Sequence, residues 1–191
     1  MNLLIIGAGG IGAGGHGRCC LDIARDMNIF DKISFLDDQN INEVINDCKI
    51  IGSIDEMSSY YPEYTHIHIA IGNNKLRSKL LLQAKEIGYS LPILQHSSSV
   101  VSNYASINEG TIIFPHAVIE PNATIGKGCI ITANTTINHD AMINDGCLIY
   151  SNSIIRPMSV IGSNTRIGSG CTITFGTDIK EETDIKDGSI I

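Results

Sequence analysis

Residues 119–143 read IEPNATIGKGCIITANTTINHDAMI, and an isoleucine stands at every sixth position of this stretch. The same rule extends from Val101 to Ile191 without an insertion. A period of six fits neither an α-helix, with 3.6 residues per turn, nor an amphipathic strand, with a period of two. It is typical of a hexapeptide β-helix, in which each hexad forms a short strand and a corner.

The hexads predict a triangular prism in which three hexads close one turn and successive turns stack roughly 4.8 Å apart. The stretch from Val101 to Ile190 has room for five complete turns. The isoleucines fill the interior, where β-branched side chains pack on those above and below. The fourth position after each isoleucine is small, and we interpret Cys129, Cys147 and Cys171 at this position as compact core residues.

The bulk properties of the chain narrow its class. It has 191 residues and a formal net charge of −7, and the absence of a basic cluster predicts no nucleic-acid partner. The six cysteines form no CxxC pair, so we expect them to be reduced. The N-terminus reaches Gly7 after a short apolar run with no basic residue, which indicates a buried strand and not a signal peptide. With no run of transmembrane length, the sequence predicts a cytoplasmic protein without membrane association.

The first half of the chain has a different pattern. Short apolar segments at 3–6, 33–36, 50–54 and 66–71 indicate strands, and 18–27 and 75–87 indicate helices. This alternation predicts a small parallel α/β sheet of Rossmann-like type. His66 and His68 on the last strand are expected to be hydrogen-bonded structural residues. We therefore expect two domains, 1–95 and 96–191.

Three segments follow predicted strands and would meet at the carboxyl edge of this sheet, where ligands bind in such folds. They are the glycine-rich segment 7–17, the pair Asp37–Asp38, and the segment 72–74. Bare glycine amides at a helix N-terminus favour phosphate. Asp37 or Asp38 could accept hydrogen bonds from a ribose or a base. The alternative is that the glycines only make a tight turn and the aspartates only end a strand.

The glycine-rich segment contains a tandem duplication, GAGGI at 7–11 followed by GAGGH at 12–16. The dinucleotide fingerprint GxGxxG therefore fits in two registers, and an acidic strand end follows about twenty residues on. This pattern supports a second interpretation, an NAD(P)-binding oxidoreductase. The predicted sheet is too small for two mononucleotide halves, so we rank that interpretation lower.

Together the two halves resemble the sugar O-acetyltransferases and UDP-4-amino-sugar N-acetyltransferases, which are hexapeptide-repeat acyltransferases that include sialic-acid O-acetyltransferase-like members. The resemblance covers essentially the whole chain. It is carried by LIIG at 4–7, GGHGR at 14–18, FLDD at 35–38, AIGNN at 70–74 with Arg77, and NHD at 138–140.

The resemblance implies a Rossmann-like nucleotide-sugar-binding domain over 1–95 and a left-handed β-helix acetyl-CoA and catalytic domain over 96–191. It also implies acetyl-CoA as cosubstrate and a homotrimer with active sites at subunit interfaces. The reaction would transfer an acetyl group to an amine or hydroxyl of an amino sugar that is nucleotide-linked. The site residues that it implies are His139 as general base with Asp140 beside it, and, for substrate binding, Gly14, Gly15, His16, Gly17, Asp37, Asp38, Gly72 and Asn73.

The residues around His139 suggest how such a transfer would work. His139 follows Ile137 at an outward hexad position, and an imidazole can take a proton from the attacking group. The side chain of Asp140 is expected to point the other way, which leaves Glu120, just over one turn earlier, as an alternative carboxylate to fix the imidazole tautomer. We expect direct transfer without an acyl-enzyme. The histidines lack metal-ligand spacing, so no metal is predicted.

Two departures from the family pattern support a third interpretation, a trimeric scaffold with impaired catalysis. Leu148 stands where many relatives carry a second histidine. Many relatives also continue past the prism into a Gly-x-Pro-Ala segment, which this sequence does not contain after Ile191.

Overall fold

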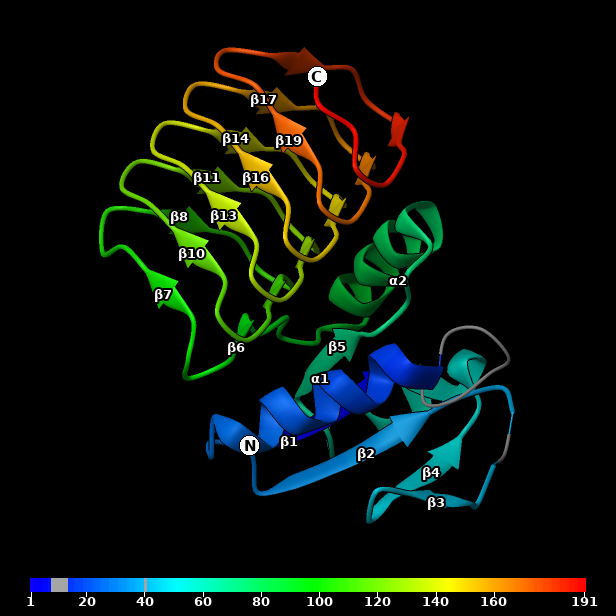
Figure 1. The fold of residues 1–191 in the computed structure, drawn as a ribbon. Coiled ribbons are helices and arrows are strands. Elements are labelled where there is room, and N and C mark those ends of the chain that lie inside the picture. The colour runs from blue at the N-terminus through cyan, green and yellow to red at the C-terminus, as the bar shows by residue number, and fades with distance from the viewer. Residues whose placement is uncertain (8–13, 40) are drawn as a thin grey trace. The chain divides into compact units, whose positions relative to one another are not determined.

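The computed structural model describes residues 1–7, 14–39 and 41–191. Through its internal contacts the chain divides into two compact units, Met1–Leu94 and Gln95–Ile191 (Figure 1). Most of the duplicated glycine-rich segment, residues 8–13, lies outside the described residues. The two units are described separately below.

The first unit is a small α/β sheet with helices. Its elements are β1 (Asn2–Ile6), α1 (Gly14–Asp26), β2 (Lys32–Leu36), β3 (Val44–Ile45), β4 (Cys48–Gly52), the 3₁₀ helix η1 (Ile54–Tyr60), β5 (His66–Ile69) and α2 (Asn74–Ile87). Within the described residues the strand order is β3-β4-β2-β1-β5. All pairs are parallel except β3 and β4, which pair antiparallel.

Strand β3, which pairs with β4 in a hairpin at the edge of the sheet, is the strand of the first unit that the sequence did not indicate. Its turn residues Asn46 and Asp47 both have positive φ, 47° and 57°, as a two-residue hairpin turn of type I′ requires. Because β3 has only two residues, it carries no readable alternation of apolar and polar positions. The predicted Rossmann-like sheet is confirmed, with this hairpin added at its edge.

In the first unit, buried side chains pack on both faces of the sheet. Leu4, Ile6, Leu36, Ile67 and Ile69 pack in one buried cluster with side chains of η1 and α2. Their sequence neighbours, such as His68, point to the opposite face, because side chains alternate along a strand. Strands buried on both faces read as continuous apolar runs, which is why β1 and β5 were identifiable in the sequence.

Helix α1 begins at Gly14, four residues before the predicted start at residue 18. Glycine lowers helix stability by about 1 kcal/mol relative to alanine, so the run from Gly14 to Gly17 carried no helix signal. The substrate-binding residues predicted in this segment therefore lie in the first turn of α1 and not in a loop. Helix α2 matches the prediction closely, with Asn73 as its N-cap and Gly88 as a left-handed C-cap at φ 112°.

The second unit is the predicted left-handed β-helix, built from two-residue parallel strands in three sheets (Figure 1). One sheet contains β7 (Val100–Val101), β10 (Val118–Ile119), β13 (Thr136–Ile137), β16 (Ile154–Ile155) and β19 (Thr172–Ile173). The next contains β8 (Ser106–Ile107), β11 (Thr124–Ile125), β14 (Met142–Ile143), β17 (Val160–Ile161) and β20 (Asp178–Ile179). The third contains β6 (Leu94–Gln95), β9 (Ile112–Ile113), β12 (Ile130–Ile131), β15 (Leu148–Ile149), β18 (Arg166–Ile167) and β21 (Asp184–Ile185).

The register of the prism is the one that the hexads predict. Ile119 pairs with Ile137, and Ile137 pairs with Ile155, so each isoleucine stacks on the isoleucine three hexads away. The isoleucines from Ile113 to Ile173 form one buried cluster with the small residues between them.

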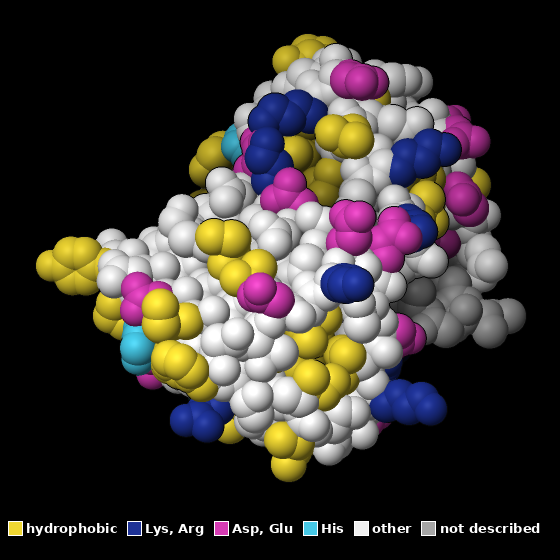
Figure 2. All heavy atoms as spheres, turned by 90° about the horizontal axis from the view of Figure 1, so that it is seen from above, with side chains coloured by type: hydrophobic (Ala, Val, Ile, Leu, Met, Phe, Trp, Pro, Cys, Tyr) yellow, Lys and Arg dark blue, Asp and Glu magenta, His cyan; other side chains and the backbone are white. Residues whose placement is uncertain are grey.

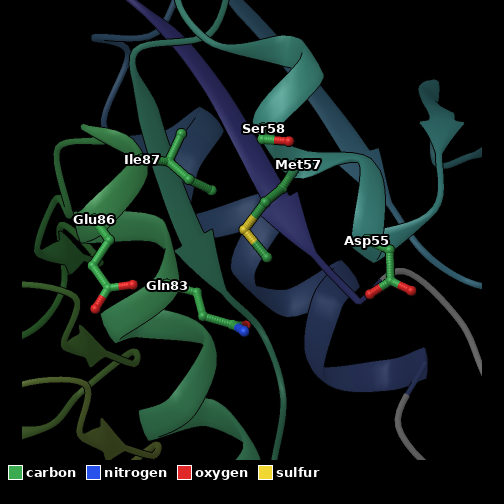
Figure 3. Close-up of a pocket in the computed structure, with 6 residues that line it drawn as sticks. All are labelled: Asp55, Met57, Ser58, Gln83, Glu86 and Ile87. Carbon is green, nitrogen blue, oxygen red and sulfur yellow. The ribbon is translucent and has the colours of Figure 1, made fainter.

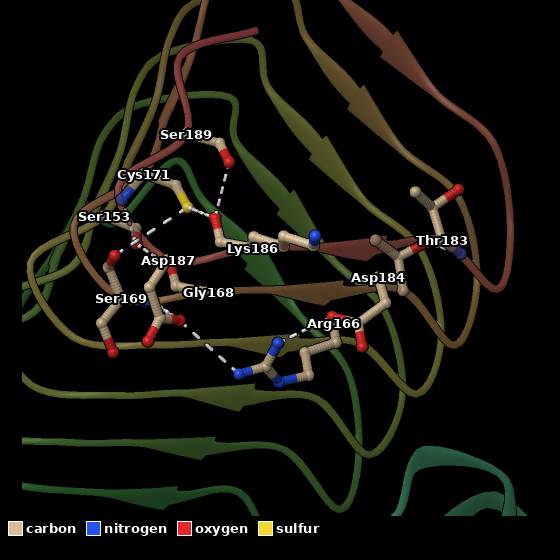
Figure 4. A network of polar contacts seen from close by, with 11 residues as sticks. Ser153, Arg166, Gly168, Ser169, Cys171, Thr183, Asp184, Lys186, Asp187 and Ser189 are labelled. Atoms are coloured by element: carbon tan, nitrogen blue, oxygen red, sulfur yellow. Dashed lines mark hydrogen bonds and ion pairs between the residues drawn. The ribbon is translucent and has the colours of Figure 1, made fainter.

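The small residues at the fourth position after each isoleucine also make hydrogen bonds inside the prism. Cys129, Cys147 and Cys171 are fully buried, as interpreted from the sequence. Their thiols also donate hydrogen bonds to backbone carbonyls of the next turn, for example Cys171 Sγ to Lys186 O at 3.0 Å (Figure 4). The hydroxyl of Ser153 makes the same contact with Gly168 O at 2.7 Å. These positions satisfy buried carbonyl groups at the corners of the prism.

The corners follow a second rule. The third residue after each isoleucine from Ile107 onward has a left-handed backbone with φ between 56° and 74°. These residues are Gly110, His116, Asn122, Gly128, Asn134, Asp140, Gly146, Asn152, Met158, Asn164, Gly170, Gly176, Glu182 and Gly188. Glycine and asparagine adopt this conformation most readily, so His116, Asp140, Met158 and Glu182 are the exceptions.

The surface carries mixed charges. On the face in Figure 2, Lys and Arg side chains lie interspersed with Asp and Glu side chains. Within the described part of the chain, no helix has the length and apolar character needed to cross a membrane.

Candidate active site

His139 and Asp140 form a hydrogen-bonded pair at one corner of the prism, directly after β13. His139 Nδ1 lies 2.8 Å from Asp140 Oδ2. Both side chains are about half exposed, at 54% and 46%. When Nδ1 carries the proton and donates it to the carboxylate, Nε2 holds a lone pair and can accept a proton. The pair therefore has the arrangement of a general base with an orienting carboxylate.

The position of the Asp140 side chain corrects the sequence-based expectation that it points away from His139. That expectation assumed the alternation of side chains in an extended strand. Asp140 instead has φ 59°, in the left-handed region. A left-handed residue turns the chain sharply, and at this corner the two neighbouring side chains meet on one side.

Glu120, the alternative carboxylate, has a different contact. Its Oε2 accepts a hydrogen bond from the backbone N–H of His139 at 2.8 Å and thereby holds the corner in place. Asn122, which sequence reasoning missed, donates from Nδ2 to Asp140 Oδ1 at 3.2 Å. The hydrogen bonds from His139 and then from Asn122 lower the pKa of Asp140 below its ordinary value. Asp140 is therefore ionised at neutral pH.

The first unit brings the loops after β1, β2 and β5 to one edge of the sheet. The N–H of Gly7 donates to Leu36 O, and that of Ala70 donates to Ile6 O, both at 2.8 Å. The N–H of Asp37 donates to Gly52 O at 3.0 Å. The predicted substrate residues Asp37, Asp38, Gly72 and Asn73 thus share the carboxyl edge of the strands, as expected for a parallel sheet.

Several of these residues have structural contacts. Asp37 is buried and its Oδ1 accepts from the N–H of Gln39 at 2.8 Å. Asp38 Oδ1 accepts from the N–H of Ile54 at the start of η1, at 3.0 Å. Asn73 Oδ1 accepts from the N–H of Leu76 at 2.9 Å and caps α2. These contacts agree with the alternative that the strand-end residues fix local structure.

Gly15 and Gly72 differ from those residues because they border open space. Apart from the adjoining residues and the backbone of its own helix, a Cβ placed on either glycine would meet no heavy atom of the described residues within 4 Å. Gly15 lies in the first turn of α1, which contains no acidic residue, so the amides at this helix end are suited to a negatively charged ligand. Gly15 is exposed and Gly72 is half-buried, so a ligand could come close to the backbone at both positions.

Arg77 is a buried residue that holds the loop before α2. Its Nη1 donates to Ile71 O at 2.8 Å and to Gly72 O at 3.2 Å, and its Nη2 donates to Asn74 Oδ1 at 2.8 Å. The side chain is only 1% exposed. An arginine in the second turn of a helix gives no sequence signal of burial, so only the family resemblance pointed to it.

Two histidines on the α1 side of the sheet are kept neutral. Burial and the nearby His16 and Arg77 lower the pKa of His68 to about 3. Burial and the charge of Arg77 lower the pKa of His16 to about 4, and the His16 Nε2 lies 3.7 Å from Cys20 Sγ. His68 was expected to be hydrogen-bonded, but both of its ring nitrogens are buried without a partner in the described structure. The expectation for His68 was wrong because strand periodicity predicts burial and not hydrogen bonding.

We expect the free energy of unfolding to fall as the pH decreases below about 6.5, because the unfolded chain protonates these histidines there and the folded chain does not. His68 alone would cost about 2 kcal/mol at pH 5. Urea unfolding at pH 7.5 and pH 5 measures the loss, and His68→Leu should reduce it. His116→Asn, at an exposed corner, is the control. An equal loss in His68→Leu and the wild type would contradict the assignment.

A pocket of about 350 Å³ lies between η1 and the C-terminal part of α2 (Figure 3). Its lining residues are Asp55, Met57, Ser58, Gln83, Glu86 and Ile87. None of the predicted site residues lines it, and Asn73 stands at the other end of α2. Among the described residues, no group of three His, Cys, Asp or Glu side chains could hold a metal ion.

Both halves of the chain resemble known protein families. Residues 11–84 match the family described as PglD N-terminal domain, and residues 96–191 match the GMPPB C-terminal domain family. The acetyltransferase domain of PglB from Neisseria gonorrhoeae has a similar structure, with a TM-score of 0.92 and 28% identity over 100% of this chain and 90% of that one.

Two further solved structures contain ligands. The same PglB domain in complex with acetyl coenzyme A has a TM-score of 0.87 and 28% identity, covering 99% of this chain and 94% of that chain. PerB from Caulobacter crescentus, in complex with CoA and GDP-perosamine, has a TM-score of 0.91 and 23% identity, covering 100% and 88%. A family model matches each half of the chain. The β-helix belongs to the GMPPB C-terminal domain family, and the whole chain belongs to the amino-sugar N-acetyltransferases with a hexapeptide-repeat fold.

Proposed function

We propose that this acetyltransferase transfers the acetyl group of acetyl-CoA to the amine of a nucleotide-linked amino sugar, with His139 as the general base. The observation that carries the proposal is the 2.8 Å contact between His139 Nδ1 and Asp140 Oδ2. The complexes of PglB with acetyl coenzyme A and of PerB with CoA and GDP-perosamine support the choice of substrates.

The proposed reaction uses Nε2 of His139, the ring nitrogen that does not contact Asp140. As the amine nitrogen attacks the thioester carbonyl, Nε2 takes the proton that the nitrogen must lose. The new C–N bond forms, the C–S bond breaks, and the proton passes on to the departing thiolate to give free CoA. Asp140 stays ionised, holds the Nδ1 proton and stabilises the imidazolium that forms between these two steps.

We propose direct transfer, because the cysteines are poor candidates for an acyl-enzyme. The three cysteines of the prism are fully buried. Burial also raises the pKa of Cys19, Cys20 and Cys48, so their thiols are protonated at neutral pH. None of the six cysteines forms a disulfide, which suits a reducing compartment, and we place the reaction in the cytoplasm. Acetyl label that stays on the protein after removal of acetyl-CoA would argue for a ping-pong route.

We propose that residues 1–95 bind the nucleotide sugar and that residues 96–191 bind acetyl-CoA and carry the catalytic pair. The accessible amides at Gly15 and Gly72 would contact the nucleotide phosphates, with His16, Gly14 and Gly17 in the same helical turn. Asp37, Asp38 and Asn73 would shape this edge of the sheet, against which the ribose and base would bind.

We also propose a homotrimer with active sites at the subunit interfaces. Val100, Met142, Met158 and Phe175 are apolar side chains of the prism with exposed fractions of 62%, 44%, 58% and 61%. Covering such side chains at a subunit interface would remove apolar surface from water, which favours association. Size-exclusion chromatography with light scattering should give three times the chain mass. A monomer at micromolar concentration would contradict the trimer.

One screen tests the function. The protein is incubated with acetyl-CoA and a panel of UDP-, GDP- and dTDP-linked amino sugars, and the mixture is analysed by mass spectrometry and by a thiol assay for free CoA. We expect one acetylated nucleotide sugar per CoA released, and resistance of the product to mild alkali would identify an amide rather than an ester. Acetylation of the free sugar but not of its nucleotide form would contradict the nucleotide-linked acceptor.

A further inference from the structure

Asn122 lies directly below the catalytic pair in the prism. It precedes Asp140 by eighteen residues, which is one turn, and both residues occupy the left-handed corner position, at φ 61° and 59°. The Asn122 Nδ2 donates a hydrogen bond of 3.2 Å to Asp140 Oδ1. Stacking of equivalent corners therefore places an amide donor under the carboxylate that holds the base.

The carboxylate of Asp140 divides its two oxygens between two partners. Oδ2 contacts His139 Nδ1 at 2.8 Å, and Oδ1 accepts from Asn122. A carboxylate held at only one oxygen can rotate about its terminal torsion, which is broad. With both oxygens held, its plane is fixed, and the imidazole that it contacts keeps one orientation and one tautomer.

The backbone at position 140 strengthens the argument. Glycine or asparagine occupies most of the left-handed corners of the prism, and aspartate occupies only this one. Glycine would satisfy the backbone at this corner at lower cost. Asp140 thus keeps a carboxylate at a corner where glycine would relieve the backbone, and that carboxylate contacts both His139 and Asn122.

We propose that Asn122 is a positioning residue for acetyl transfer, acting through Asp140 on the tautomer and orientation of His139. This inference rests on the proposed function of His139. Asn122 need not touch either substrate, so its loss should lower kcat and leave the KM values for acetyl-CoA and the sugar unchanged.

A double-mutant cycle tests the proposal. Asn122→Gly removes the amide and keeps the left-handed corner, and Asp140→Gly does the same for the carboxylate. We expect Asn122→Gly to lower kcat about threefold to tenfold. In the Asp140→Gly background, which should itself lose about tenfold or more, Asn122→Gly should have no further effect. Asn152→Gly, at the equivalent position of another corner with φ 61°, is the matched control and should keep wild-type kcat.

A spectroscopic readout separates this inference from the proposed function. The ¹⁵N chemical shifts of the His139 ring should report the Nδ1–H tautomer in the wild type and a mixture of tautomers in Asn122→Gly. Wild-type kcat and wild-type ring shifts in Asn122→Gly would overturn the role of Asn122, as would an equal additional loss in the Asp140→Gly background. Full activity in His139→Ala would instead overturn the proposed function itself.

Discussion

Replacing His139 with alanine is expected to lower kcat for acetyl transfer by about 10²- to 10⁴-fold, the usual contribution of a general base. The variant keeps the acetyl-CoA and sugar sites, so its KM values should change little. The reason lies in the pair at the corner: Asp140 holds Nδ1, and Nε2 alone can take the proton from the amine. Initial rates measured by release of the CoA thiol give the comparison.

The matched control is His116, the other histidine at the corners of the prism. It is exposed and has φ 60°, so His116→Asn preserves its left-handed backbone. This variant should keep wild-type kcat, and His139→Asn should lose activity as His139→Ala does. Equal rates for His139→Ala and the wild type would remove His139 from the reaction.

The second large effect concerns stability. Ile155→Ala is expected to lower the free energy of unfolding by about 2–5 kcal/mol, because it removes a buried side chain and leaves a cavity inside the prism. Ile155 is fully buried and stacks between Ile137 and Ile173. Its neighbours are themselves buried residues held in the same register, so few groups can move to fill the space. Urea unfolding followed by circular dichroism measures the change.

The adjacent residue provides the control for this substitution. Ile154 belongs to the same strand, β16, but points outward and is 41% exposed. Ile154→Ala should cost about 1 kcal/mol or less, since much of its apolar surface is already in water. A loss for Ile154→Ala as large as that for Ile155→Ala would contradict the inward and outward assignment of the hexad.

The β-helix was predictable from the sequence because its physical constraints repeat. Every hexad needs a β-branched residue inside and a small residue directly after the left-handed corner residue, so the rule is visible many times over. The register of Ile137 between Ile119 and Ile155 follows directly from it. The sheet of the first unit was predictable for another reason, since its strands are buried on both faces and read as apolar runs.

The features that were missed depend on single residues. The start of α1 was hidden by glycines, whose low helix propensity is overridden by the surrounding structure. The contact between His139 and Asp140 depends on one left-handed backbone angle, at a position where glycine or asparagine is the common choice. The hydrogen bond from Asn122 joins residues eighteen positions apart, and only the completed turn brings them together.

The buried side chains of the first unit show the same limit. Sequence periodicity placed His68 on a strand face but gave no information on its hydrogen bonds. Arg77 was predicted within a helix and as part of the family resemblance, but its contacts with Ile71 and Gly72 depend on where the preceding loop turns. Burial of a polar group is decided by tertiary packing, which a periodic pattern does not encode.

One measurement tests the central claim most directly. Wild type and His139→Ala are each incubated with acetyl-CoA and the nucleotide-linked amino sugar identified by the screen, and acetylated product and free CoA are quantified from the same samples. We predict equal amounts of product and CoA with the wild type and at least a hundredfold slower formation of both with His139→Ala. Equal rates for the two proteins, or CoA release without acetylated sugar, would contradict acetyl transfer with His139 as its base.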